Sequence, residues 1–235
     1  MLGKTGNWNG DDLLKIVLEH PATAKRLAWR ICDELFGENV VSESAMAELA
    51  TGLAERELDL AWAFKTVLNS GLFFSDANLK SRIAAPETFV LGSLIALETS
   101  VRPASTLALA DVFVSLGRSL FQPPNVGGWD GGRSWLNART LVARSNFVDA
   151  VIRNGMNRNA KPPAFDAIVD SFDDKENVDS VVVQLIELLL GLDRNSETGK
   201  AVAADASEQV KNQPIDTRWA FTAQLLLNSS SAHLC

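Results

Sequence analysis

Apolar residues recur along most of this chain at the spacing of one face of an α-helix. A clear example is the set Ala24, Leu27, Ala28, Ile31 and Leu35, which lie at i, i+3, i+4, i+7 and i+11. This period predicts helices that each bury one side, and no alternation of apolar and polar residues is long enough to predict a strand. We therefore predict an all-α protein, an irregular multi-helix bundle with one long ordered loop rich in proline, glycine and tryptophan.

Capping residues and helix breakers divide this pattern into segments. Ser42, Asp59 and Ser134 can each cap the N-terminus of a helix, as can Asn9 or Asp11. Gly71 suits a left-handed helix end. Prolines in first turns mark further starts, and the predicted helices span residues 11–20, 21–36, 42–55, 59–70, 86–99, 103–117, 134–154, 178–190, 201–211 and 217–227.

One polar segment interrupts the helical pattern. Residues 154–163 are rich in asparagine and contain two adjacent prolines, a composition typical of a linker or surface loop. We therefore expect a main helical domain over residues 1–153, a linker or long loop over 154–176, and C-terminal helices over 177–235 that pack on the same bundle.

The central loop, residues 120–137, has the most unusual composition in the chain. It contains two prolines, four glycines and two tryptophans, which together predict a shaped and ordered loop. In one interpretation, Trp129 and Trp135 anchor the loop on the bundle and Arg133 bonds to backbone carbonyls. In the other, the loop is a recognition surface, because tryptophan faces stack on flat apolar groups and on sugars.

The recognition interpretation gives a functional hypothesis. It describes a non-catalytic binding or assembly module that contacts a partner protein or a glycan. Its candidate binding residues are Asn125, Trp129, Asp130, Arg133, Trp135 and Asn137. The alternative is a hydrolase acting on cell-surface carbohydrate, in which Asp130 and an acid from another helix form the catalytic pair.

Charge and hydropathy argue against several classes of partner. The formal net charge of −7 disfavours binding to a nucleic acid, which requires clustered cations. The longest apolar run, residues 181–190, is interrupted by Gln184 and Glu187 and is too short to span a membrane. The N-terminal residues lack the pattern of a signal peptide.

The sequence contains no motif for a metal or a cofactor. His20 and His233 are the two histidines, and neither has a second ligand at zinc spacing. Acids at residues 7–12 fit helix capping better than a calcium loop, and the glycines lack the pattern of a phosphate loop or a nucleophile elbow. We therefore predict no metal site and no cofactor, and we interpret Cys32 as a core residue.

Several segments resemble the bacterial family called domain of unknown function 1800, and in particular its C-terminal portion. The main match is QPPNVGGWDGGRSWLN at residues 122–137, followed by TLVARSNF at 140–147, with support from residues 6–12, 19–24 and 84–87. The similarity extends to about Val151 and then weakens. It implies a mainly helical fold, and longer members are often exported and encoded beside a sulfatase-related family. It assigns no activity or catalytic residue to any position.

Overall fold

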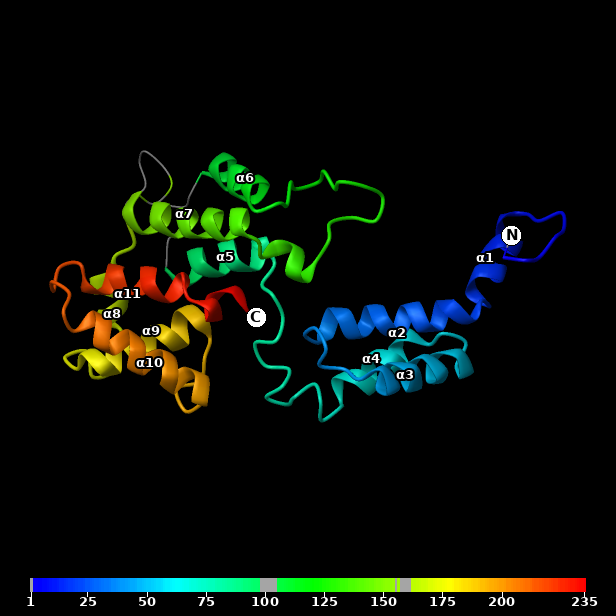
Figure 1. Cartoon of the computed structure of the whole chain (residues 1–235), viewed down its shortest axis with the longest axis horizontal. Helices are drawn as coiled ribbons and strands as arrows, with labels where there is room; N and C mark the ends of the chain where they lie inside the picture. The colour runs from blue at the N-terminus through cyan, green and yellow to red at the C-terminus, as the bar shows by residue number, and fades with distance from the viewer. Residues whose placement is uncertain (1, 98–104, 155, 157–161) are drawn as a thin grey trace. The chain divides into compact units, whose positions relative to one another are not determined.

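The computed structural model describes residues 2–97, 105–154, 156 and 162–235 (Figure 1). These residues form helices and no strand, which confirms the predicted all-α class. A single antiparallel bridge joins Ile83 and Leu234. The contacts divide the chain into two compact units, a first unit Met1–Arg82 and a second unit Ile83–Cys235.

The first unit is a small helical bundle in which α2 packs against α3 and α4. Its core combines small and large apolar side chains, among them Ala28, Leu53 and Ala63, and it includes the buried thiol of Cys32. The helices of this unit are α1 (Gly10–Leu18), α2 (Pro21–Leu35), α3 (Glu43–Glu55) and α4 (Leu60–Leu68).

Side-chain caps start these helices where the sequence predicts them. Asn9 forms a capping box with Asp12 at the start of α1. The side chains of Ser42 and Asp59 accept hydrogen bonds from backbone N–H groups in the first turns of α3 and α4. The starts of the first four helices are therefore confirmed.

The predicted left-handed glycine at the end of α4 is wrong. The helix ends at Leu68, and its C-cap Asn69 has a φ of −96°. The Asn69 amide donates to the carbonyl of Lys65 at 2.7 Å, and the Ser70 hydroxyl donates to that of Val67 at 2.7 Å. Because these side chains satisfy the last carbonyls, the helix ends without a left-handed residue at Gly71.

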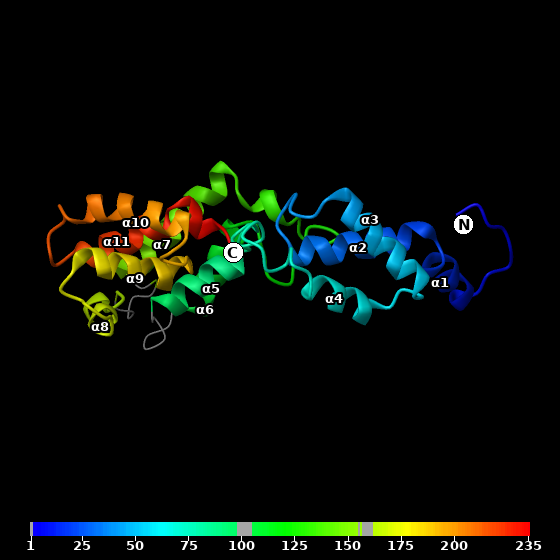
Figure 2. The ribbon, with the colours of Figure 1, turned by 90° about the horizontal axis from the view of Figure 1, so that it is seen from below.

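The second unit contains two adjoining cores that share α11. In the first core, Phe89, Phe147 and Leu227 pack together in a cluster built from residues of α5, α6, α7 and α11. In the second, Leu185 and Leu226 pack where α9, α10 and α11 lie side by side (Figure 1, Figure 2). The elements are α5 (Pro86–Ala96), α6 (Thr106–Ser115), the 3-10 helix η2 (Gly132–Trp135), α7 (Ala138–Asn154), α8 (Phe165–Asp170), α9 (Val178–Leu190), α10 (Glu197–Val210), α11 (Arg218–Leu227) and the 3-10 helix η3 (Ser230–His233).

The start of α7 differs from the prediction. Ser134 lies inside η2, and α7 begins four residues later, at Ala138. Asn137 caps it instead, since its side-chain oxygen accepts from the N–H of Thr140 at 3.1 Å. The expected helix end at Thr99 and the expected start at Pro103 lie outside the described residues.

The segment predicted as a linker contains a short helix. Within residues 154–176, α8 spans Phe165–Asp170 and buries Ile168 and Val169 in the core around α9. Residues 155 and 157–161 lie outside the described part of the chain. The division into domains at residues 153 and 177 stays a prediction, while the contacts place a boundary between Arg82 and Ile83.

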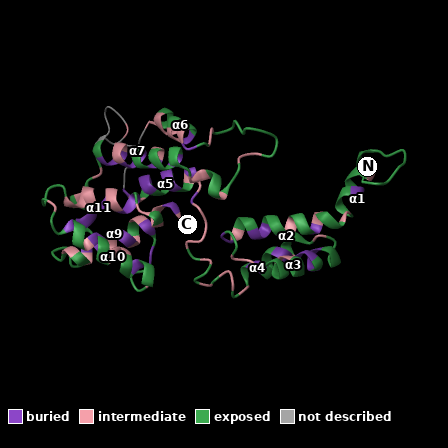
Figure 3. Ribbon diagram, in the orientation of Figure 1, coloured by how far each residue is buried: buried purple, intermediate pink, exposed green. Residues whose placement is uncertain are grey.

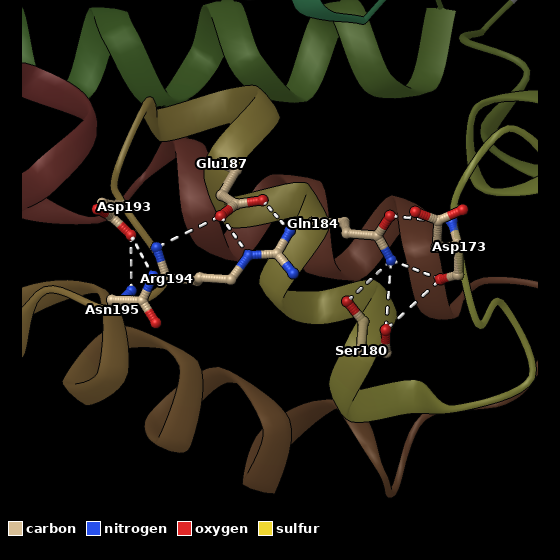
Figure 4. A network of polar contacts seen from close by, with 7 residues as sticks. All are labelled: Asp173, Ser180, Gln184, Glu187, Asp193, Arg194 and Asn195. Carbon is tan, nitrogen blue, oxygen red and sulfur yellow. Dashed lines mark hydrogen bonds and ion pairs between the residues drawn. The ribbon is translucent and has the colours of Figure 1, made fainter.

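The two polar residues in the apolar run of α9 tie its flanking loops to the helix (Figure 4). The Gln184 amide donates to the carbonyl of Asp173 at 2.6 Å and accepts from its N–H at 3.0 Å. Glu187 accepts a bond from Nε of Arg194 at 2.6 Å. Within the described residues no helix is long and apolar enough to cross a membrane.

Candidate functional site

Arg118 holds the base of the central loop. Its guanidinium carbon lies 4.7 Å from the ring centroid of Trp129 and 5.6 Å from that of Trp135. Its Nη2 atom also lies 2.9 Å from Oε1 of Glu87, at the start of α5. A cation within about 6 Å of an aromatic ring is attracted by the ring's quadrupole. Arg118 therefore attaches both tryptophans to α5.

The two tryptophans are partly buried, and the polar atoms around Arg118 are incompletely satisfied. Nε1 of Trp135 and Oε2 of Glu87 are both buried and have no hydrogen-bond partner among the described residues. A buried polar atom without a partner costs about 1–3 kcal/mol. The base of the loop thus carries one unsatisfied donor and one unsatisfied acceptor.

Both candidate asparagines shape the backbone. Oδ1 of Asn125 accepts from the N–H of Gly127 at 2.7 Å, and the Asn125 carbonyl accepts from Gly128 at 3.1 Å. Gly128 has a φ of +92°, a conformation that favours glycine. Asn137 caps α7 and also donates to the carbonyl of Ser134 at 3.2 Å. The Asn125 oxygen is therefore engaged within the loop, and the Asn137 oxygen is engaged by the first turn of α7.

The tip of the loop, residues 121–126, is exposed (Figure 3), and most of its side chains are apolar. Phe121 is 95% exposed and Val126 is fully exposed. Phe121 also has a φ of +63°, an uncommon value for a bulky residue. Asp130 and Arg133 are exposed between this tip and α7.

A second arginine lies in the core of the second unit. Arg144 on α7 is only 1% exposed, and its Nη2 donates to the carbonyl of Ala84 at 2.7 Å. Its guanidinium carbon lies 4.7 Å from the ring centroid of Phe89, while Nε and Nη1 have no partner among the described residues. Burial lowers the pKa of Arg144 to about 10, and an electrostatic interaction with Cys235 acts in the opposite direction by raising it.

The C-terminal tail, residues 230–235, covers this arginine. The N–H of Ala84 donates to the carbonyl of His233 at 2.8 Å, and the His233 ring lies 5.6 Å from that of Phe89. Burial, followed by the charge of Arg144, lowers the pKa of His233 to about 4. The imidazole is therefore neutral at neutral pH.

The structure brings together two of the six candidate residues at one cation. Trp129 and Trp135 meet at Arg118, which the sequence analysis did not select. His20 caps α2 through a bond that its Nδ1 accepts from Ala22. Within the described part of the chain, no three His, Cys, Asp or Glu side chains gather in a geometry that could hold a metal ion.

Comparison with known families identifies the chain. A family described as "Protein of unknown function (DUF1800)" matches residues 1–233. The chain belongs to the DUF1800 family. This confirms the resemblance seen in the sequence, and the match reaches beyond Val151, where the similarity was expected to weaken. No curated protein and no solved structure matches this DUF1800 chain.

Replacing Arg118 with alanine should loosen the base of the loop in this DUF1800 protein. The change removes the contacts with both tryptophans and leaves Glu87 without its ion pair, so we expect a loss of about 1–2 kcal/mol in stability. Limited proteolysis should then cut residues 120–131 faster than in the wild type. Arg139→Ala, at an exposed position on α7, is the matched control. Equal cleavage of the two variants would show that Arg118 does not hold the loop.

Proposed function

We propose that this DUF1800 chain is a non-catalytic binding or assembly module whose central loop docks on a partner protein. The observation that carries the proposal is the exposure of Phe121 and Val126 at the tip of a loop whose base is attached through Arg118. Exposed apolar side chains on an anchored loop are typical of an interaction surface, because burying them on a partner is favourable. An anchored base also reduces the entropy lost on binding.

A partner protein fits this surface better than a glycan does. Trp129 and Trp135 already contact Arg118, which limits the ring area that is free to stack on a sugar. The side-chain oxygens of Asn125 and Asn137 already accept hydrogen bonds from Gly127 and from Thr140 in α7, so they offer little to sugar hydroxyls. The tip offers apolar area instead, with the polar side chains of Asp130 and Arg133 beside it. This combination resembles the apolar centre and polar rim of a protein interface.

No observation favours the hydrolase alternative. Asp130 is exposed and has no hydrogen bond or ion pair among the described residues. Glycoside hydrolysis by a carboxylate pair needs a second acid facing the same cleft. The binding module is therefore the better supported function.

A photo-crosslinking amino acid in place of Phe121 tests the proposal. We expect ultraviolet light to join the full chain to a discrete partner in extracts of the source cell, and the same probe in place of Leu107 should not capture that partner. Leu107 on α6 is a suitable control because it is 73% exposed and lies outside the loop. The purified partner should then bind the wild type and lose at least about tenfold in affinity to the double variant Phe121→Ser, Val126→Ser. A glycan array that retains the wild type and not the double variant would favour a sugar ligand and contradict the protein partner.

A further inference from the structure

The first unit contains a pocket whose lining includes no residue of the central loop, and the inference drawn from it goes beyond the proposed function. The pocket has a volume of about 660 Å³ and lies where α3 and α4 meet the end of α2. Its floor includes Cys32, Leu49 and Val67, which are buried apolar residues of the first core. Pockets that bind small molecules have volumes of about 300–1,000 Å³ and a mostly apolar lining. The size and the floor of this pocket therefore suit a small ligand with an apolar body.

One wall of the pocket is built by contacts between α3 and α4. The ring of Trp62 lies only 2.1 Å from the place that a β-carbon on Gly52 would occupy, so a glycine is needed there. Arg56 stacks over Trp62 at 4.3 Å from the ring centroid and donates to the Gly52 carbonyl at 3.1 Å. Its Nη1 atom also lies 3.5 Å from the Glu55 carboxylate. The positive charge of Arg56 is thus already engaged in holding the wall.

Glu48 supplies the unneutralised charge at the mouth of the pocket. It lies on α3 one turn before Gly52, lines the pocket and is exposed. Its carboxylate has no hydrogen bond or ion pair among the described residues, whereas the two other charged residues of the lining, Glu55 and Arg56, face each other. A cation near Glu48 would gain a favourable interaction, and an anion there would be repelled.

We infer that this pocket binds a small organic cation, with its apolar body on the floor between α3 and α4 and its ammonium group beside Glu48. The apolar body supplies most of the affinity, because it removes apolar surface from water. The interaction of the ammonium group with Glu48 gives a cationic ligand a higher affinity than a neutral or anionic ligand of the same size. The hydroxyls of Thr51, Thr66 and Ser70 also line the pocket and can accept hydrogen bonds from the ammonium group.

Three ligands with the same body and different heads test the charge preference. They are 4-phenylbutylamine, 4-phenylbutanol and 4-phenylbutyrate, each titrated into the full chain while the Trp62 indole and Gly52 amide signals are followed by NMR. Since an exposed ion pair contributes about 0.2–1 kcal/mol, the amine should bind about 1.4-fold to fivefold more tightly than the alcohol, and the acid most weakly. Glu48→Gln should remove the difference between amine and alcohol, and Glu43→Gln, on the same helix outside the pocket, should keep it.

Filling the pocket tests whether the apolar body enters it. Thr66 lines the mouth from α4, and Thr66→Phe should weaken the binding of all three ligands. Its neighbour Lys65 is exposed and outside the lining, so Lys65→Phe should leave binding unchanged. Ala45→Phe fills the mouth from α3 if the first variant does not fold. Equal affinity for the three head groups, or no effect of either filling variant on binding, would overturn the inference.

Discussion

Replacing Arg144 with alanine should lower the free energy of unfolding of the second unit by about 3 kcal/mol. The substitution removes a side chain that is 1% exposed, leaves a cavity against Phe89 and takes away the hydrogen bond to the Ala84 carbonyl. Large-to-small changes in a core cost about 2–5 kcal/mol, and an orphaned buried carbonyl adds to that loss. The variant also no longer buries a positive charge, and this change raises the free energy of unfolding and offsets part of the loss. Urea unfolding followed by circular dichroism measures the difference.

Arg144→Met separates the volume of the side chain from its charge. Methionine fills much of the same space without burying an ion, so this variant should be more stable than Arg144→Ala. A loss below about 0.5 kcal/mol in the alanine variant, the level of an ordinary surface substitution, would contradict the described burial of Arg144.

Stability should fall as the pH is lowered from about 6.5 to about 4, because of His233. Its pKa is lowered from 6.5 to about 4 in the folded chain, so the unfolded chain binds the proton first. The stabilising contribution of the neutral imidazole is complete above pH 6.5 and is lost progressively down to pH 4. From these two pKa values we expect the protein to be about 2 kcal/mol less stable at pH 5 than at pH 7.5 through this group.

Comparing two histidine variants isolates this effect. His233→Gln removes the titrating group and should reduce the difference in unfolding free energy between pH 7.5 and pH 5 by about 2 kcal/mol. His20→Gln changes the other histidine, which caps α2, and should retain most of the difference. An equal pH dependence in the wild type and His233→Gln would show that the burial of His233 does not control acid stability.

Local capping chemistry made the helices of the first unit predictable. Asn9, Ser42 and Asp59 each accept a hydrogen bond from the backbone N–H three residues later, so sequence neighbours suffice to identify them. The start of α7 was missed because two residues, Ser134 and Asn137, could cap it. The helix α8 was missed because six residues between polar segments give little periodic signal.

The contacts of Arg118 and Arg144 depend on residues far apart in the sequence, and for that reason the sequence could not predict them. Arg118 reaches Glu87, and Arg144 bonds to a carbonyl 60 residues earlier. Apart from one glycine beside Arg118, nothing local distinguishes these two arginines from Arg133, a predicted binding residue. The adjacency of Arg118 to Gly117, a left-handed residue just beyond α6, is the one local signal that an ordered turn begins there.

The sequence pattern also did not predict the contacts made by the two polar residues within the apolar run of α9. In the sequence, Gln184 and Glu187 served only to argue against a membrane span. In the structure, Gln184 binds the loop before α9 and Glu187 binds the loop after it. Their spacing places them on one face, but the partners, Asp173 and Arg194, come from opposite ends of α9. A helical period predicts which residues face outward and not what they bind.

The hydrogen bond between Ala84 and His233 affects how the protein can form during synthesis. A ribosome delivers the chain from its amino end, and domains generally fold in that order. The core of the first unit is complete once residues up to Phe73 have emerged. The contacts of His233 with Ala84 and Phe89 form only after the rest of the second unit has emerged, and until then Phe89 lacks this cover. For that interval the nascent chain exposes apolar surface of the kind that makes incompletely folded chains prone to aggregate.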